Sequence, residues 1–459
     1  MEKKEREKRC HVLVLTYPLQ GHINPLLQFA KRLVSKGVKV TIAATHFTVR
    51  SICAQGVEVE TISDGFDEGG FMQAPSAEAY LESFRTVGSR TLGELVLKLQ
   101  ERGSPVSCLV YDSFLPWALN VARESGIYAA SFFTQSASVC SIYWHAHRGL
   151  MALPVPTEAM PVSIPGLPSL ESSELPSFLA SPESYPTYLS VIFDQLTDLD
   201  KNDWVFSNTF EELEGKVTKA MTGLWPVTMI GPMVPSAYLD KRIKGDTGYG
   251  ASLWKQNSEE YMKWLERRAP SSVLYISFGS LAKVTAEQME EVAWGLGESG
   301  QPFLWVVKEL EHEKLPDGFM KSIQEIGLIV NWCDQLEVLA HQAVGCFLTH
   351  YGWNSTLEGL SLGVPMVGVP QWSDQPTNAK FVEDVWGVGV RAKCDDKGIV
   401  RREELKRCIK EVMERERGKV IKGNAIKWKE LAKEAISEGG SSDKKIDEFV
   451  GRLLNVKGT

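Results

Sequence analysis

WCDQLEVLAHQAVGCFLTHYGWNSTLEGLSLGVPMVGVPQWSDQ, residues 332–375, contains two short apolar runs separated by a polar stretch. The runs at 345–349 and 364–369 are typical of buried parallel strands. The residues between them begin with Gly352, which gives the backbone freedom to turn, and continue as a helix. This strand–helix–strand order predicts a parallel α/β domain.

The start of that helix has the composition of an anion-binding site. Asn354, Ser355 and Thr356 are good N-cap residues, and Glu358 follows Ser355 at the spacing of a capping box. A helix N-terminus after a strand attracts negative charge through its free N–H groups and its dipole. His350 adds a proton donor beside it, so the segment is suited to a phosphate.

Flat and polar side chains surround the same helix start. Trp332, Trp353 and Trp372 offer faces on which a ring can stack, and Asp374 and Gln375 offer groups that bind hydroxyls. Singly, each has a plainer explanation, such as core packing for a Trp or exposure for a Gln. Together they predict a site for a phosphate, a ring and a sugar.

The stretch resembles the nucleotide-sugar box of plant UDP-dependent glycosyltransferases, which act on small hydrophobic secondary metabolites. The first Trp, the HxGWNSTLE motif at 350–358 and the closing Asp-Gln all match. The resemblance extends from QGHINP at 20–25 to GGSSDKKIDEF at 439–449. It implies the α/β GT-B fold, in which two Rossmann-like, doubly wound domains face each other across a cleft.

The resemblance also assigns roles. It implies that Trp332 stacks on uracil, that Gln335 and Glu358 bind the ribose, and that a terminal Gln375 goes with glucose. The groups expected to hold the charge of UDP are Ser280, His350, Asn354 and Ser355. The groups expected to meet the sugar hydroxyls are Trp353, Asp374 and Gln375.

The first half of the chain alternates strands and helices, which predicts a parallel sheet. The expected strands are 11–17, 39–45, 57–62, 106–111 and 128–134. In a doubly wound sheet of order 3-2-1-4-5, the first and fourth strands are neighbours. Ligands bind beside their carboxyl ends, at the switch point.

His22 and Asp112 follow those two neighbouring strands, so the sheet order alone can bring them together. A carboxylate on one ring nitrogen would orient the imidazole and leave the other nitrogen free to accept a proton. The alternative is a capping or core His and an Asp that caps the helix at 116–125. The resemblance favours the first interpretation, since both residues match the family's catalytic base and its partner.

Leu19, Phe114, Phe133 and Tyr143 lie near the expected strand ends, and we predict that they wall an apolar acceptor pocket. Core packing is the alternative for each of them. Relatives usually have a small residue at position 19 and a Cys at position 351. Leu19 therefore favours an apolar acceptor, whereas the phenol of Tyr351 is expected to crowd the phosphate loop.

Four domain segments are expected. They are an acceptor-binding domain at 1–235, a linker at 236–258, a UDP-sugar domain at 259–440, and a helix at 441–459 that packs back on the first domain. Two charged helices are expected at 401–420 and 421–439.

The composition narrows the function classes. The 459 residues carry a net charge of −8 without a large basic region, which excludes nucleic acid as a partner. No apolar run reaches the roughly 18 residues of a membrane span. The eight cysteines are scattered and show no CxxC, as in a reduced cytoplasmic protein. We expect a monomer and no stable membrane insertion.

Metal sites are not expected. The Asp-Leu-Asp at 198–200 falls in an amphipathic stretch, and His145 and His147 are two residues apart, so they point different ways on a helix. Zinc spacings are absent, and no GxGxxG follows the first expected strand, so the dinucleotide-binding fingerprint is missing there.

We therefore expect an inverting, metal-independent glucosyltransferase that transfers glucose from UDP-glucose to a hydroxyl or carboxyl of a terpenoid, steroid or phenolic acceptor. This subgroup is indicated by YPLQGHINPLLQFAKRL at 17–33 and VPSAYLDKRI at 234–243. The alternatives are a nucleotide-sugar hydrolase or epimerase and a silent UDP-sugar-binding protein.

Overall fold

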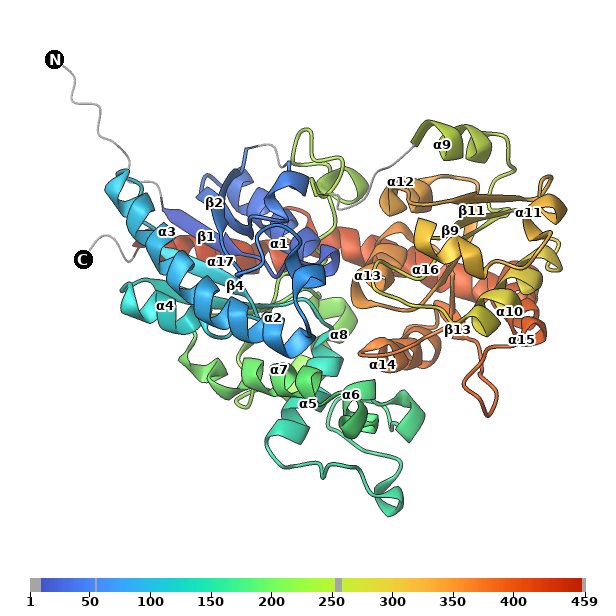
Figure 1. Cartoon of the computed structure of the whole chain (residues 1–459), viewed down its shortest axis with the longest axis horizontal. Coiled ribbons are helices and arrows are strands. Elements are labelled where there is room, and N and C mark those ends of the chain that lie inside the picture. Colours follow the sequence, from blue (N-terminus) through green and yellow to red (C-terminus); the bar gives the residue numbers. More distant parts are fainter. Residues whose placement is uncertain (1–9, 54–55, 252–257, 456–459) are drawn as a thin grey trace.

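The computed structural model describes residues 10–53, 56–251 and 258–455 and forms two α/β domains side by side (Figure 1). The charged start of the chain (1–9) lies outside the described residues, as do 252–257 of the expected linker and 456–459. Each domain is built on its own parallel sheet.

The first domain is a seven-stranded parallel sheet of order β3-β2-β1-β4-β5-β6-β7, which contains the predicted order 3-2-1-4-5. Its strands are β1 (His11–Leu15), β2 (Lys39–Thr45), β3 (Glu58–Ile62), β4 (Cys108–Asp112), β5 (Tyr128–Phe133), β6 (Trp204–Ser207) and β7 (Val227–Met229). β1 ends two residues earlier than predicted, because Thr16 and Tyr17 already turn toward α1.

β1 and β4 are direct neighbours, with Leu15 paired to Tyr111. Both strands are fully buried. Their carboxyl ends therefore open at the same edge of the sheet, which is the switch point of a doubly wound domain.

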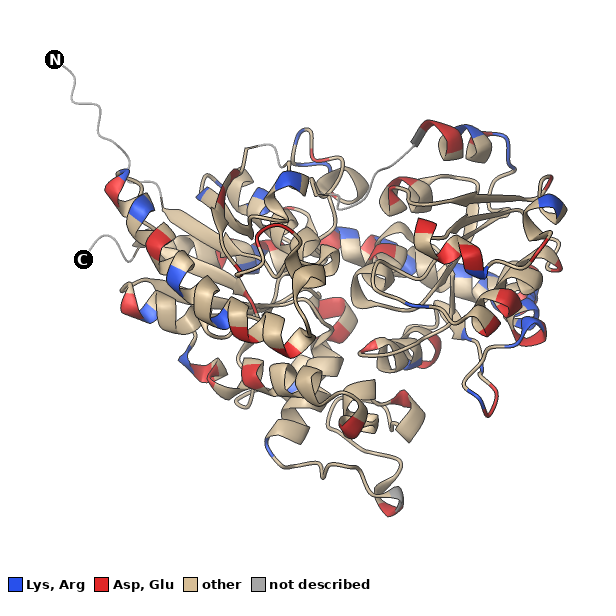
Figure 2. Ribbon diagram, in the orientation of Figure 1, with Lys and Arg blue, Asp and Glu red and all other residues tan. Residues whose placement is uncertain are grey.

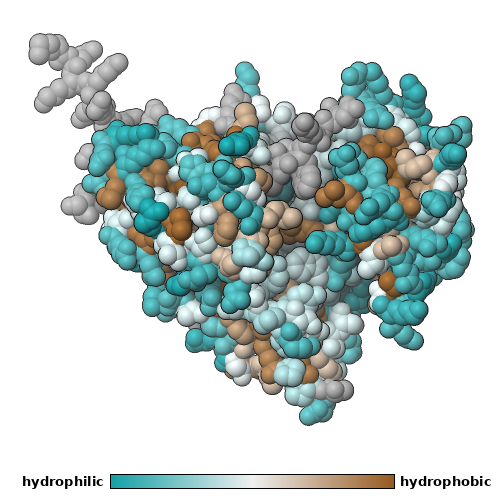
Figure 3. Space-filling model, viewed as in Figure 1, coloured by the Kyte–Doolittle hydropathy of each residue, from teal (hydrophilic) through white to brown (hydrophobic). Residues whose placement is uncertain are grey.

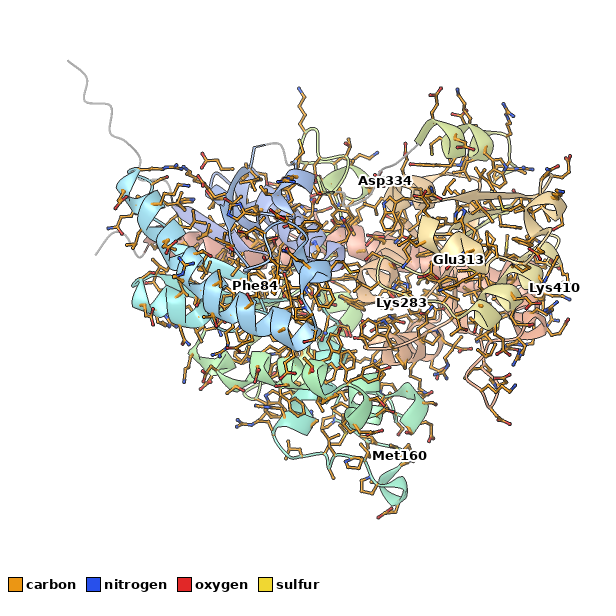
Figure 4. The ribbon with its side chains drawn as sticks, in the orientation of Figure 1. Phe84, Met160, Lys283, Glu313, Asp334 and Lys410 are labelled. Atoms are coloured by element: carbon orange, nitrogen blue, oxygen red, sulfur yellow. The ribbon has the colours of Figure 1, made fainter. Side chains whose placement is uncertain are left out.

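Helices cover both faces of this sheet. They are α1 (Gln20–Ser35), α2 (Ala77–Ser83), α3 (Ser89–Glu101), α4 (Ala118–Glu124), α5 (Ala137–His147), α6 (Ser177–Ala180), α7 (Pro186–Thr197) and α8 (Glu211–Ala220). The helix expected over 77–100 is present, but a π turn at Phe84–Gly88 divides it. Phe84, labelled in Figure 4, packs its ring 6.3 Å from that of Tyr17 at the switch point.

The second domain is a six-stranded parallel sheet of order β10-β9-β8-β11-β12-β13. Its strands are β8 (Val273–Ser277), β9 (Phe303–Val306), β10 (Gly327–Val330), β11 (Val344–Thr349), β12 (Met366–Gly368) and β13 (Gly389–Arg391). Here too β8 and β11 are the neighbours at the switch in strand order.

The helices of the second half begin at α9, after the linker. They are α9 (Ser258–Glu266), α10 (Ala286–Gly297), α11 (Phe319–Ser322), α12 (Gln335–Ala340), α13 (Trp353–Leu362), α14 (Gln375–Lys380), α15 (Arg402–Met413), α16 (Glu416–Ile436) and α17 (Ser441–Asn455). The break between the two charged helices was predicted near 420 but falls at 414–415. Charge periodicity alone does not mark it.

Helix α17 lies against the first domain rather than the second (Figure 1). Phe449 packs edge-on against Trp204 and Phe206. Lys36, the C-cap of α1, pairs with Asp443 at 2.7 Å, and the hydroxyl of Ser442 donates to the carbonyl oxygen of Gly231. The last helix is thus part of the first domain's core.

Charges of both signs are spread over the outer surfaces of both domains (Figure 2). In the view of Figure 3, apolar residues gather between the two halves, where the hydrophilic cover is thinner. Among the described residues, no helix combines the length and apolar character needed to cross a bilayer. Among the described residues, Cys53 and Cys394 are exposed and the other six cysteines are buried.

Candidate active site

The helix expected at the anion site is present, but it begins earlier than predicted. Gly352 is the N-cap of α13, so Ser355 and Glu358 lie inside the helix and form no capping box. The N-cap Gly352 has no side chain to bond this end, and the backbone N–H of Trp353 is bonded to the Asp374 carboxylate. A phosphate at this helix end would therefore use the N–H groups that follow Trp353 in the first turn.

His350 lies directly after β11, between two glycines. A Cβ atom at Gly279 would come within 2.7 Å of its ring, and one at Gly352 within 2.5 Å. Burial lowers the pKa of His350 to about 4, with the nearby cation Lys308 adding to the shift. The imidazole is neutral at pH 7, so it offers a phosphate a hydrogen bond without a full charge.

Tyr351 does not crowd the phosphate loop. Its ring points into the core and fills the space over Gly368, where a Cβ would lie 1.6 Å from the ring. Its hydroxyl donates to the carbonyl oxygen of Val390 at 3.0 Å. The expectation of a crowded loop was wrong, because the positive φ of 61° at Tyr351 turns the side chain inward.

Glu358 and Gln335, the two expected ribose groups, contact each other. The Nε2 group of Gln335 donates to Glu358 Oε2 at 2.6 Å and to Ser355 Oγ at 3.0 Å, while its Oε1 accepts from the hydroxyl of Tyr275. Asp334, labelled in Figure 4, caps the helix that carries Gln335. Burial raises the pKa of Glu358 to about 7, and its hydrogen bonds oppose part of that rise.

Asp374 and Gln375 start α14 beside α13. Asp374 is buried, which raises the pKa of its carboxyl group, while Asn378 donates to it at 2.6 Å. The Oε1 atom of Gln375 accepts from the backbone N–H groups of Gln371 and Trp372. These bonds fix both side chains in orientation, as hydroxyl recognition requires.

Trp353 differs from its expected use. Its side chain is 4% exposed, and its indole N–H donates to the carbonyl oxygen of Asn208. Its backbone N–H faces the Asp374 carboxylate. The indole therefore joins the two domains, and only the backbone of Trp353 borders the expected sugar groups.

Ser280 and Trp332 complete the second-domain set. Ser280 is half-buried, and its carbonyl oxygen accepts from the ammonium group of Lys308 at 3.3 Å. Lys308 also donates to the carbonyl of Ala282 at 2.7 Å and so holds the loop after β8. Trp332 is half-buried just before α12.

His22 and Asp112 are in contact, as their strand positions predicted. The Nδ1 atom of His22 lies 2.8 Å from Asp112 Oδ2, and Asp112 is fully buried. The other oxygen of Asp112 accepts from the backbone N–H of Phe114 at 3.0 Å. The carboxylate thus orients the ring through Nδ1.

Aromatic rings flank the imidazole. The ring centroids of Tyr17 and Phe114 lie 5.2 and 4.7 Å from that of His22. Phe114 and Leu19 are half-buried beside it. In contrast, Phe133 and Tyr143 are almost fully buried in the core. This agrees with core packing, the alternative to lining an acceptor pocket.

The segment that carries His22 and the N-terminus of α13 meet at the domain junction. The side-chain amide of Asn354 donates to the carbonyl oxygen of Gly21, the residue before His22. Helix α13 of the second domain and α1 of the first thus present their N-termini to the same space. A donor bound at one and an acceptor bound at the other would lie next to each other.

Comparison with known proteins decides the family. The family model described as "UDP-glucoronosyl and UDP-glucosyl transferase" matches residues 243–436. UDP-glycosyltransferase 74B1 of Arabidopsis thaliana is 52% identical over 453 residues, which cover 96% of this chain and 97% of that protein. The chain belongs to the plant UDP-glycosyltransferases.

Other members of this UDP-glycosyltransferase family agree in extent and in fold. Mogroside I-E synthase of Siraitia grosvenorii is 46% identical over 449 residues, covering 96% of this chain and 98% of that one. The crystal structure of Os79 from O. sativa with UDP superposes with a TM-score of 0.92 at 42% identity, covering 96% and 100% of the two chains. The GT-B fold expected from the sequence is confirmed, as is the activity of a UDP-glucosyltransferase.

Several groups of this UDP-glycosyltransferase's site were not predicted from the sequence. The hydroxyl of Thr134 lies 3.2 Å from His22 Nδ1. Its place after β5, next to β4, is a signal that could have identified it. The hydroxyl of Tyr249 donates to Glu358 and that of Tyr275 to Gln335, and no local sequence pattern reveals these tertiary contacts. The described residues contain no group of three or more acidic, His or Cys side chains placed to hold a metal.

Proposed function

We propose that this UDP-glucosyltransferase inverts the sugar's configuration, uses His22 as general base with Asp112 as its partner, and glucosylates a hydrophobic acceptor. The observation that supports the proposal is the contact of 2.8 Å between His22 and Asp112. The residue before His22, Gly21, accepts a hydrogen bond from Asn354 of the second domain, so this contact lies at the domain junction.

The mechanism is a direct displacement. His22 Nε2 takes the proton of the acceptor oxygen while that oxygen attacks C1 of an α-linked glucose. The C1–oxygen bond to UDP breaks, and the product is a β-glucoside or a glucose ester. Asp112 stabilises the imidazolium that forms, and such a base contributes about 10²–10⁴ in rate.

The leaving UDP carries negative charge toward the N-terminus of α13. The proposed donors are the N–H groups after Trp353 in the first turn, the neutral imidazole of His350 and the side chains of Asn354, Ser355 and Ser280. These donors suffice in the proposed mechanism without a metal ion. Trp332 would stack on uracil, and Asp374 and Gln375 would hold the glucose hydroxyls.

An apolar acceptor fits the surroundings of the base. The rings of Tyr17 and Phe114 and the side chain of Leu19 border His22, and they favour terpenoid, steroid or phenolic bodies over sugars. The proposal includes a monomer in the cytoplasm, in agreement with its reduced cysteines.

A mixed acceptor panel tests the proposal. UDP-glucose is incubated with triterpenoids, steroids, flavonoids, phenols and aromatic acids, and the products are identified by mass spectrometry and by the anomeric NMR coupling. A β-linked hexose adduct supports transfer with inversion. UDP release without an acceptor would instead favour the hydrolase alternative, and UDP binding without turnover would favour a silent binder.

UDP binding should release a proton near pH 7 through Glu358. The pKa of this buried carboxyl is about 7 in the free protein. Ribose hydroxyls donate to the ionised form, so UDP lowers the pKa, and affinity should fall as the pH drops from 8 to 6. Calorimetry in buffers of different ionisation enthalpy measures the release. Glu358→Gln should abolish the proton release that comes from Glu358 and keep the release that comes from the UDP phosphate. Unchanged total proton release would contradict the ribose-binding role of Glu358.

Leu19→Ser should stabilise the protein and change its acceptor preference. Leu19 is the N-cap of α1 and supplies no side-chain cap. A Ser hydroxyl there would accept from the first turn and add about 1 kcal/mol of stability. It should also lower kcat/KM for acceptors with a single hydroxyl on an apolar body relative to polyhydroxylated ones. Denaturant unfolding measures the stability, and the ratio of kcat/KM between the two kinds of acceptor measures the preference, with Leu19→Ala as control. An unchanged ratio would argue against placing Leu19 in the acceptor pocket.

A further inference from the structure

Residues 246–251, here called the tether, connect the two domains but are bound to the first. Asp246 is buried and accepts from Lys31 at 2.8 Å and from Gln28 at 2.6 Å, both on α1. The backbone N–H of Ser236 also donates to the Asp246 carboxylate. This end of the tether is therefore held firmly along α1.

The rest of the tether follows the same helix. Lys31 also donates to the carbonyl oxygen of Gly248, and Gln20 donates to that of Ala251 at 3.0 Å. The backbone N–H of Cys53 donates to Gly250. The anchors on α1 thus begin two residues from His22, so the tether moves with the proposed base.

One side chain of the tether reaches the other domain. The hydroxyl of Tyr249 donates to Glu358 Oε1 at 2.8 Å, while Gln335 donates to the second oxygen. Burial disfavours the ionised form of Glu358, and each of these donors favours it. One donor comes from the same domain as Glu358, but the other is supplied by the first domain.

We propose that Tyr249 is a positioning residue that couples the alignment of the two domains to recognition of the donor's ribose. The proposal rests on the ribose role of Glu358 in the proposed function. When α1 and α13 separate, the phenol leaves and Glu358 becomes a weaker acceptor. Strong binding of a ribonucleoside diphosphate therefore belongs to the arrangement in which the base already faces the donor.

Tyr249→Phe tests the coupling with two nucleotides, UDP and 2′,3′-dideoxy-UDP, titrated by calorimetry. The wild type should bind the dideoxy form about tenfold more weakly, as expected for a lost bond to a charged group. The variant should bind UDP about five- to tenfold more weakly than the wild type does. Its affinity for 2′,3′-dideoxy-UDP should equal that of the wild type. Its KM for UDP-glucose should rise with little change in kcat, and the pH below which UDP affinity falls should increase.

A merely structural role gives a different pattern, because it weakens both nucleotides equally. That result, or unchanged UDP affinity, would overturn the coupling. A wild type indifferent to the ribose hydroxyls would overturn the ribose role and this proposal together, whatever the enzyme transfers. Tyr80→Phe is the matched control: it removes a 2.7 Å phenol bond to the buried Asp64 in the first domain and should leave both affinities unchanged.

Discussion

His22→Ala should reduce glucosyl transfer by about 10²–10⁴ while leaving UDP affinity within a factor of about two. The imidazole contacts Asp112 and two aromatic rings of the first domain, whereas the expected diphosphate donors lie on the second. The variant therefore loses the proton acceptor and keeps the nucleotide site. Initial rates at saturating UDP-glucose and UDP titrations measure the two quantities.

Two further variants make this result specific. Asp112→Asn keeps a hydrogen-bonding group near His22 but removes the charge that stabilises the imidazolium, so an intermediate loss of kcat is expected. His46→Ala removes an exposed His of the same domain and should not change the rate. A His22→Ala enzyme with normal turnover would mean that the acceptor oxygen loses its proton elsewhere.

Tyr351→Cys should lower the free energy of unfolding by about 3 kcal/mol without strengthening UDP-glucose binding. The ring is fully buried over Gly368, and its hydroxyl bonds to Val390. The smaller side chain leaves a cavity and loses one hydrogen bond. Denaturant unfolding measures the stability, and competition with UDP measures the donor affinity.

Tyr351→Phe separates these two losses, since it keeps the ring and removes only the hydroxyl. We expect about 1 kcal/mol of destabilisation from it. If Tyr351→Cys were instead as stable as the wild type and bound UDP-glucose more tightly, the phenol would be crowding the donor loop after all.

The strand order of the first domain followed from the sequence because the alternation of buried strands and amphipathic helices is strong there. From that order, the contact between His22 and Asp112 could be predicted, since side chains after neighbouring parallel strands meet at one edge. Cross-domain bonds could not be predicted. The indole N–H of Trp353 donates to the backbone carbonyl oxygen of Asn208, and no local sequence pattern predicts this bond.

The first residue of helix α13 could not be predicted from the sequence either. Three good N-cap residues in a row favoured a start at 354–356, but Gly352 forms the cap. Tertiary packing decides here, because Trp353 must lie in the helix for its indole to reach Asn208. The direction of the Tyr351 ring depends on a left-handed backbone that the residue type does not favour.

Helix α17 has a consequence for the order in which the protein is made. It packs through Phe449 onto strand β6 and through Asp443 onto α1. During synthesis, the half that is translated first must therefore wait for one of the last-translated segments before its apolar surface is covered. A fragment ending after β7 would expose that surface, so the N-terminal half is not an independent folding unit although its sheet is complete.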